Sequence, residues 1–403
     1  METLLNPSIR CLDIQTVRKS SSEMEKVGVN PVGIQIMEQK LVHLNLKISG
    51  LTTAQANIIK QELLSVGGEA AVSGGVVSCE VDATDAILSG TYKQLNRVIK
   101  KLKVQPYGLA DLGDALTNAI FNSLQKEIVL EGRSERWVLG NRTLIMGVLN
   151  VTPDSFFDGG RYLDRDAAIE RAVDMVEEGA DIIDIGGEST RPGSKSVSLK
   201  EELERVIPVV EELVRRGIKV SLDTTKAEVA KQALDIGVEI INDVSALSYD
   251  KEMVSVCAKY RPGVILMHMR GKPFNMQDDI TYSDLLAEVF DYLRKRIEFV
   301  VNSGIQLSRI AIDPGIGFGK SEKDNLKLLK NISEFKSLGR PIVIGTSRKS
   351  FIGKTLDLGA DERLEGTAAT VAVGILKGAN IVRVHDVGEI RRVVDMTDAI
   401  KES

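Results

Sequence analysis

The chain has 403 residues, with 52 Lys and Arg against 57 Asp and Glu. Its formal charge of −5 is too small to predict a nucleic-acid-binding protein or a polybasic membrane protein. The 43% of hydrophobic residues is typical of globular chains and excludes a disordered or fibrous protein. Because one domain usually has roughly 100–200 residues, we expect either a large barrel with an appendage or two domains.

The three cysteines, Cys11, Cys79 and Cys257, are odd in number and far apart, which excludes a disulfide framework and a CxxC metal site. They favour a reducing, cytoplasmic setting. Polar and charged residues interrupt the start of the chain, and no long apolar run follows. We therefore expect neither a signal peptide nor a membrane span.

We predict that residues 1–138 form an N-terminal extension, which holds a small α+β domain over about 40–130. Its first ~35 residues lack periodicity and indicate a loosely structured lead-in. The expected strands are 41–48, 70–72 and 76–81, followed by an apolar run at 86–88. The expected helices are 53–64, opened by Thr52, 92–102 and 109–130. No catalytic constellation occurs here, so we expect this domain to pack on the rest of the chain or to aid self-association.

From about residue 139, short β-branched runs alternate with longer amphipathic stretches, which is typical of successive βα units. The predicted strands are 144–149, 182–185, 219–222, 239–241, 264–267, 310–312, 342–344 and 381–384. The predicted helices are 166–178, 199–215, 227–234, 283–302, 324–332 and 363–376. Eight strands in about 265 residues fit a (β/α)8 TIM barrel over 139–403, with a doubly wound open sheet as the alternative.

The chemistry of such a barrel lies where the strands end, and all eight predicted ends are polar or glycine-rich. Each Asp or Asn alone could merely cap the following helix, but eight polar exits converge on one cavity. Among them are Asn150, Glu188, Asp223, Asn242, His268, Asp313, Lys349 and Arg383.

The residue types predict a ligand with two different ends. Asp223, Asn242, Asp313 and Lys349 suit a flat amino-oxo heterocycle such as a pterin or a purine. A cationic set suits a phosphate or diphosphate, and consists of Arg191, Arg383 and His385.

A zinc site is not expected, because the only histidines, His43, His268 and His385, are not at ligand spacing. A diphosphate would bring Mg²⁺, which one side-chain oxygen such as that of Asn150 could complete. The segment 314–321 ends like a P-loop but has Pro314 where the motif needs glycine, and Arg348 breaks the motif before Gly353 in the same way. The glycines around Phe318 instead predict a sharp βα loop, with the ring free to stack on a ligand or to pack.

The segment from about Thr143 to the C-terminus resembles dihydropteroate synthase, the folate-pathway enzyme inhibited by sulfonamides. The first-loop motif is Met-Gly-Val-Leu-Asn-Val-Thr-Pro-Asp-Ser-Phe at 146–156, and the second is Asp-Ile-Gly-Gly-Glu-Ser-Thr-Arg-Pro-Gly at 184–193. Further matching blocks follow in the family's order at 221–224, 241–244, 267–269, 313–320, 347–350 and 383–387.

The resemblance implies a cytoplasmic, homodimeric transferase that uses Mg²⁺ to condense (7,8-dihydropterin-6-yl)methyl diphosphate with 4-aminobenzoate, giving 7,8-dihydropteroate and diphosphate. It implies pterin binding by Asp223, Asn242, Asp313, Lys349, Met267 and Phe318. It implies diphosphate binding by Asn150, Arg191, Arg383 and His385, with Asn150 also on the metal. It places Thr190, Arg191, Pro192 and Ser347 around 4-aminobenzoate, and the catalytic set would be Asp223, Asp313, Lys349, Arg383 and His385.

Three alternatives stay open from the sequence. A methyltetrahydrofolate-binding methyltransferase barrel uses similar Asp and Asn positions, although it has no need of the diphosphate set around Arg383 and His385. A non-catalytic pterin-binding protein could keep the fold. A synthase acting on a modified arylamine, as in methanopterin-type pathways, is the third.

Overall fold

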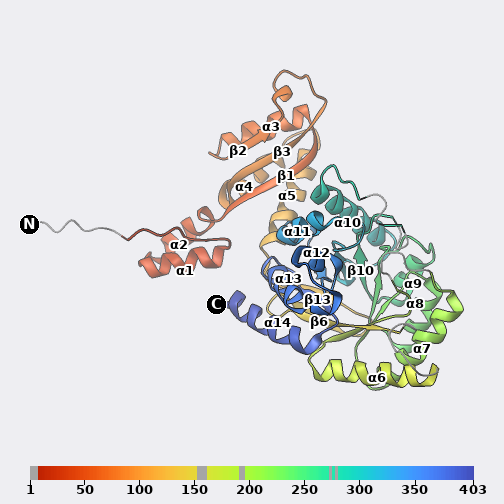
Figure 1. Ribbon diagram of the computed structural model, residues 1–403. Coiled ribbons are helices and arrows are strands. Elements are labelled where there is room, and N and C mark those ends of the chain that lie inside the picture. The colour runs from red at the N-terminus through yellow and green to blue at the C-terminus, as the bar shows by residue number, and fades with distance from the viewer. Residues whose placement is uncertain (1–7, 152–160, 190–195, 272–274, 277–279) are drawn as a thin grey trace, which may run out of the picture. The chain divides into compact units, whose positions relative to one another are not determined.

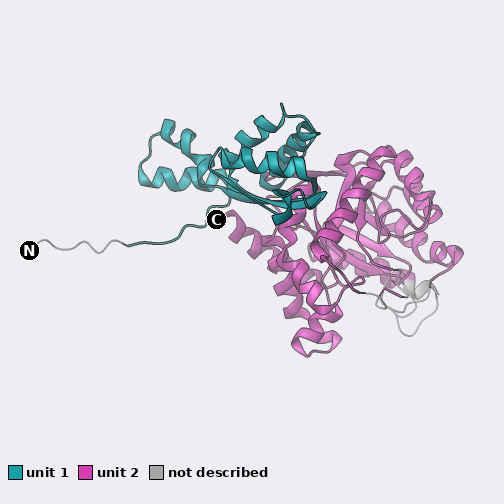
Figure 2. Cartoon of the chain, turned by 90° about the horizontal axis from the view of Figure 1, so that it is seen from above, with its two compact units in different colours: residues 1–124 teal, residues 125–403 magenta. Residues whose placement is uncertain are grey.

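The computed structural model describes residues 8–151, 161–189, 196–271, 275–276 and 280–403. The chain forms two compact units, Met1–Leu124 and Gln125–Ser403 (Figure 2). The sequence instead predicts a domain division at 138/139, which stays a prediction.

Unit 1 contains a three-stranded antiparallel sheet in the order β1-β3-β2. Two of its helices begin at threonines that make complete capping boxes, Thr52 with Gln55 and Thr91 with Gln94. Its elements are α1 (Val17–Val27), α2 (Pro31–Met37), β1 (His43–Thr52), α3 (Thr53–Leu64), β2 (Glu69–Val72), β3 (Ala83–Thr91), α4 (Tyr92–Leu102) and α5 (Leu109–Leu124) (Figure 1). Helices α3, α4 and α5 bury Ile59, Leu63, Leu95, Leu102 and Leu116 in one core with Leu88 of β3.

Three expectations for this region are wrong. Residues 17–27 and 31–37 are helical, because Thr16 and Asn30 cap two helices and Gly28 ends the first of them. Residues 76–81 form a short 3-10 turn and an irregular loop rather than a strand. The helix expected over 109–130 ends at Leu124, and the remaining apolar residues enter a strand of unit 2.

Unit 2 is a barrel of eight parallel strands in the order β11-β10-β9-β8-β7-β6-β13-β12. A parallel bridge between Ile312 and Ile342 joins the two ends of this order. The strands are β6 (Leu144–Asn150), β7 (Ile182–Gly186), β8 (Val220–Asp223), β9 (Ile240–Asp243), β10 (Gly263–Met267), β11 (Ile310–Asp313), β12 (Val343–Ile344) and β13 (Ile381–Val384). The predicted TIM barrel is confirmed, and the open doubly wound sheet is excluded.

Helices surround this barrel (Figure 1) and bury their apolar faces against it. They are α6 (Arg161–Glu177), α7 (Leu199–Arg215), α8 (Ala227–Ile236), α9 (Met253–Tyr260), α10 (Leu285–Asn302), α11 (Glu322–Lys330), α12 (Ser350–Leu356), α13 (Leu364–Leu376) and α14 (Val387–Glu402). Helix α7 shows the local logic, since Ser198 caps its start and Val206, Val209 and Leu213 recur on its buried face. None of the helices in the described part of the chain is long and apolar enough to cross a membrane.

A hairpin of β4 (Ile128–Glu131) and β5 (Arg136–Leu139) covers the N-terminal end of the barrel. Leu130, Leu139 and Trp137 pack there against residues that begin strands, such as Leu144 and Ile381. The carboxylate of Glu239 accepts hydrogen bonds from the hairpin backbone at 2.9 and 3.1 Å. This end is therefore filled, and the opposite end, where the strands finish, holds the polar residues.

Candidate active site

Buried polar residues gather at the C-terminal end of the barrel. Asp223 ends β8, Asn242 lies in β9 and Asp313 ends β11, and all three side chains are buried. The strand register places Asp223 beside Asn242 and Met267 beside Asp313. Side chains that are distant in sequence are thus brought to one end of the sheet by the parallel pairing alone.

Arg383 links three strands by charged hydrogen bonds. Its Nε donates to Oδ2 of Asp184 at 2.6 Å, and its Nη2 donates to Oδ2 of Asp223 at 2.8 Å. Nδ2 of Asn242 donates to the same oxygen of Asp184 at 3.1 Å. The sequence does not predict the fully buried Asp184 as a site residue, because Asp184 lies inside its strand and not at the strand end.

Burial perturbs the ionisation of this group. It raises the pKa of Asp223 to about 7, while the charge of Arg383 opposes the rise. It also raises the pKa of Asp313, against the effect of the Lys349 charge. Burial lowers the pKa of Lys349 to about 8, although Asp313 favours the protonated amine. Carboxylates and an ammonium that are short of solvent in this way are typical of binding sites that await a polar ligand.

Lys349 and the loop after β11 form one side of the site. The ammonium of Lys349 lies 4.2 Å from the centre of the Phe318 ring and donates to the carbonyl of Ile316. Oδ1 of Asp313 accepts a hydrogen bond from the backbone N–H of Gly315 at 2.7 Å. Asp313, Phe318 and Lys349, all predicted to bind the pterin, therefore belong to one contiguous cluster.

Lys320 holds the loop after β11 in place through its buried ammonium. The sequence does not predict this role, because Lys320 stands at the end of a P-loop-like segment. Its buried ammonium lies 2.9 Å from Nδ1 of His268 and donates to the carbonyls of Gly315 and Phe318 at 2.9 and 3.0 Å. Burial lowers the pKa of Lys320 to about 7 and that of His268 to about 2. Gly315 has φ of +71°, and a Cβ there would stand 1.8 Å from the His268 carbonyl oxygen, so only glycine fits.

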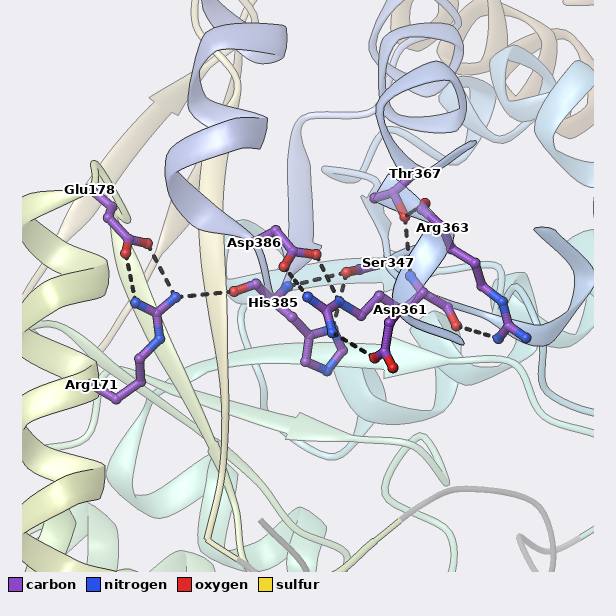
Figure 3. A network of polar contacts seen from close by, with 9 residues as sticks. Arg171, Glu178, Ser347, Asp361, Arg363, Thr367, His385 and Asp386 are labelled. Carbon is purple, nitrogen blue, oxygen red and sulfur yellow. Dashed lines mark hydrogen bonds and ion pairs between the residues drawn. The ribbon is translucent and has the colours of Figure 1, made fainter. Parts of the chain in front are cut away.

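Ser347 and His385 lie together at the ends of β12 and β13 (Figure 3). The hydroxyl of Ser347 is 3.0 Å from Nδ1 of His385 and accepts the His385 backbone N–H at 3.2 Å. Arg348 forms a two-bond ion pair with Asp386 at 3.0 and 2.5 Å, which turns its guanidinium toward that carboxylate. The structure thus joins a residue predicted for 4-aminobenzoate with one predicted for diphosphate.

Some predicted residues cannot be placed. Thr190, Arg191 and Pro192, and residues 152–156 of the first-loop motif, lie outside the described residues. Asn150 is described, and it ends β6 with a half-buried side chain. Its Oδ1 would stand 3.7 Å from a Cβ at Gly186, which directs it toward the end of β7.

No group of three or more His, Cys, Asp or Glu able to hold a metal ion occurs among the described residues. A single oxygen ligand from Asn150 nevertheless fits Mg²⁺, which keeps several waters and usually binds through substrate phosphates. Oδ1 of the buried Asp184 has no hydrogen-bond partner within the described structure, so acceptor capacity remains beside Asn150's strand.

Comparison with known proteins identifies the relatives of this chain. A family described as pterin binding enzymes matches residues 146–385. Dihydropteroate synthase of Synechocystis is 47% identical over 263 residues, which cover 65% of this chain and 91% of that protein. A solved structure of Xanthomonas albilineans dihydropteroate synthase with 4-aminobenzoic acid is 40% identical, with a TM-score of 0.65, and covers 69% of this chain and 99% of that one.

A longer relative extends the similarity into unit 1. A probable bifunctional folylpolyglutamate synthase/dihydropteroate synthase of Halobacterium salinarum is 41% identical over 390 residues, or 96% of this chain. The chain spans about half of that relative, 47% of its length. Most of unit 1 must be included in so long a match.

Fold and site together define a (β/α)8 enzyme whose strand ends carry a set of buried polar groups. The chain belongs to the pterin binding enzyme family, and its barrel is that of a dihydropteroate synthase, a transferase of folate biosynthesis.

Proposed function

We propose that this enzyme joins the amine of 4-aminobenzoate to the methylene carbon of (7,8-dihydropterin-6-yl)methyl diphosphate. A C–N bond forms, the C–O bond to diphosphate breaks, and the amine loses one proton. The observation that carries the proposal is the cluster of buried Asp223, Asn242 and Asp313 with Lys349 and Arg383 at one end of the barrel.

The pterin end is assigned to the carboxylates, the amide and Lys349. Asp313 and Asp223 would accept N–H groups of the ring, and Asn242 and Lys349 would meet its acceptor atoms. Met267, buried and paired in register with Asp313, and Phe318 would line the slot. Buried polar groups of this kind discriminate strongly against rings that leave them unpaired.

The diphosphate end is assigned to Arg383, His385, Asn150 and, outside the described residues, Arg191. The bonds from Arg383 to Asp184 and Asp223 use Nε and Nη2. Nη1 takes part in neither bond and can therefore donate to an anion. Bound Mg²⁺, held through Asn150 and the substrate oxygens, would supply charge stabilisation for the leaving diphosphate. Ser347 holds Nδ1 of His385, which orients the imidazole beside that position.

The chemistry needs little general-base help. An arylamine is neutral near pH 7, so the barrier lies mainly in departure of the diphosphate from the methylene group. Cations at one end stabilise the leaving charge, while Asp313 and Asp223 favour positive charge developing on the electron-rich pterin. Such a site suits a dissociative reaction, in which the C–O bond breaks ahead of C–N bond formation.

The acceptor is tested by comparing 4-aminobenzoate with a ribosylated arylamine in steady-state assays with Mg²⁺. We expect at least about tenfold higher kcat/KM for 4-aminobenzoate, which corresponds to about 1.4 kcal/mol. A preference for the ribosylated amine would replace the proposal by a methanopterin-type synthase. Turnover with methyltetrahydrofolate and no diphosphate release would instead establish the methyltransferase alternative.

The pH profile follows from the two shifted groups in the free enzyme. Asp223, with its pKa raised to about 7, loses its acceptor form as the pH falls through that value. Lys349, with its pKa lowered to about 8, loses its charge as the pH rises through that value. We expect kcat/KM for the pterin substrate to be bell-shaped, with limbs near these values. Lys349→Arg should abolish the alkaline limb whatever its effect on rate, and an unchanged alkaline limb would contradict the assignment.

The expected homodimer is assigned to α13 and α14. Val373, Leu376, Met396 and Ile400 on these helices are large, apolar and exposed, and a groove of about 510 Å³ runs between the helices. A cytoplasmic location belongs to the same proposal, since all three cysteines are free thiols.

Met396→Glu should weaken the dimer. The Met396 side chain is 64% exposed in the single chain and would be buried in the proposed interface, where a charge is costly. We expect the dissociation constant in sedimentation equilibrium to rise at least about tenfold, or about 1.4 kcal/mol. Val104→Glu, at an 83% exposed position of unit 1, is the matched control and should leave it unchanged. An identical dissociation constant in both variants would place the interface elsewhere.

A further inference from the structure

Unit 1 has the connectivity β1-α3-β2-β3-α4, with β3 at the centre of its sheet (Figure 1). This is the first part of the βαββαβ arrangement, in which a last strand returns to lie beside the first. Here the chain after α4 forms helix α5 instead. Among the described residues, no strand pairs with the outer edge of β1.

The outer edge of β1 presents regular backbone groups. Tyr92 N–H donates to the carbonyl of Val42 at 2.8 Å, and these residues continue the register in which His43 faces Thr91. Antiparallel pairs alternate between hydrogen-bonded and non-bonded, so even-numbered residues of β1 bond to β3. The backbone N–H and C=O groups of residues 43, 45, 47 and 49 therefore point away from the sheet.

The side chains of β1 also suit a further strand. Leu44, Leu46 and Ile48 alternate on the face that packs on the core, yet each stays only half-buried. On the other face, Asn45 and Lys47 are exposed and bond to β3, Asn45 to Ser89 at 2.8 Å and Lys47 to Asp85 at 3.6 Å. Another strand beside β1 would cover the three apolar side chains without burying an unpaired charge.

We propose that β1 pairs with β1 of a second copy of this chain, antiparallel and with the two-fold axis at Leu46. In this register Leu46 faces Leu46 of the partner, Leu44 faces Ile48, and Asn45 faces Lys47. Residues whose backbone N–H and C=O groups point away from β3 then face the same kind of residue in the second copy, so the backbone hydrogen bonds form in the regular antiparallel pattern. The two sheets join into one of six strands.

Self-complementarity selects both the occupant and the axis. Only a two-fold at Leu46 maps the apolar set Leu44, Leu46 and Ile48 onto itself. An axis at Lys47 would set two ammonium groups face to face, and an axis at Asn45 would oppose His43 to Lys47. The regular ladder ends just after Ile48, where the register with β3 shifts and Gly50 has φ of +73°, so Leu46 lies near the middle of the regular stretch.

A crosslink through one exposed cysteine, with the buried Cys257 left in place, tests the register in the full chain. With Cys11 and Cys79, both exposed, changed to Ser, Leu46→Cys should form a disulfide-linked dimer on mild oxidation. Leu44→Cys is the matched control, because in this register residue 44 lies four residues, or about 14 Å, along the strand from its own copy. Efficient crosslinking at 46 alone is the expected result. No crosslink at 46, or equal crosslinking at 44 and 46, would overturn the proposal.

A charge pair gives a second measurement that does not depend on the core. In the Met396→Glu background, Asn45→Lys should raise the dissociation constant about threefold to tenfold, because two Lys–Lys pairs form across the two-fold. Asn45→Glu should lower it by a similar factor through pairing with Lys47 of the partner. Equal constants for the two variants would exclude the edge contact, since both substitutions change the same exposed position.

Discussion

Asp313→Asn is expected to lower kcat/KM for the dihydropterin substrate by about 10²-fold or more. The carboxylate is buried, accepts the Gly315 N–H at 2.7 Å and shares its site with Lys349. The amide replaces one acceptor oxygen by an NH2 donor and removes the negative charge, so it loses a hydrogen bond to the ring and no longer favours positive charge on the pterin. Charged hydrogen bonds are worth about 1.5–3 kcal/mol, which supplies most of this factor.

Asp223→Asn should behave in the same way, because that carboxylate is assigned to the same ring and accepts a hydrogen bond from Arg383. Asp361→Asn is the matched control, since Asp361 is 98% exposed and lies only at the edge of the Arg348 pair, 3.8 Å away. Steady-state kinetics of the three variants, with near-ultraviolet circular dichroism to verify folding, make the comparison. Near-normal activity of both the Asp313 and the Asp223 variants would contradict the proposed site.

Arg383→Met is expected to lower the free energy of unfolding of the barrel by about 3–5 kcal/mol. The substitution leaves Asp184 and Asp223 as buried carboxylates without their cation. Trp137 is the only tryptophan of the chain and lies in the hairpin of unit 2, so its fluorescence during urea unfolding reports on the barrel. Activity should fall with stability, because the same guanidinium is assigned to the diphosphate.

Two comparisons separate this effect from simple loss of a side chain. Arg348→Met removes a half-exposed ion pair with Asp386 and should cost less than about 1 kcal/mol. Asp223→Asn in the Arg383→Met background should recover part of the lost stability, because it removes one unpaired charge. A cost for Arg383→Met no larger than that for Arg348→Met would show that Arg383 does not stabilise the two carboxylates.

The eight strands of the barrel could be predicted because buried parallel strands read as short β-branched runs. The predicted strand ends placed Asp223, Asn242 and Asp313 at the C-terminal end of the barrel, because the residues that follow parallel strands meet at that end in a TIM barrel. Asp184 escaped that rule because it lies inside its strand, and Lys320 escaped because its contacts are made by a loop. Neither contact has a local signal in the sequence.

The errors in unit 1 have a different cause. Short apolar runs such as 76–81 fit a strand by composition, yet no neighbouring strand in the described structure pairs with them. The end of α5 was misplaced because Ile128 and Leu130 continue its apolar spacing but contribute to the hairpin under the barrel instead. The two helices before β1 have their capping residues in the sequence, but α1 holds few apolar residues and α2 has only seven residues, so neither shows a clear apolar periodicity.

The most direct test of the central claim is a product assay of the full chain with the dihydropterin diphosphate, 4-aminobenzoate and Mg²⁺. Dihydropteroate and diphosphate are measured together, with and without a chelator. The proposed site predicts the two products in a one-to-one ratio and their loss when Mg²⁺ is removed. Binding of the pterin without release of diphosphate would contradict it.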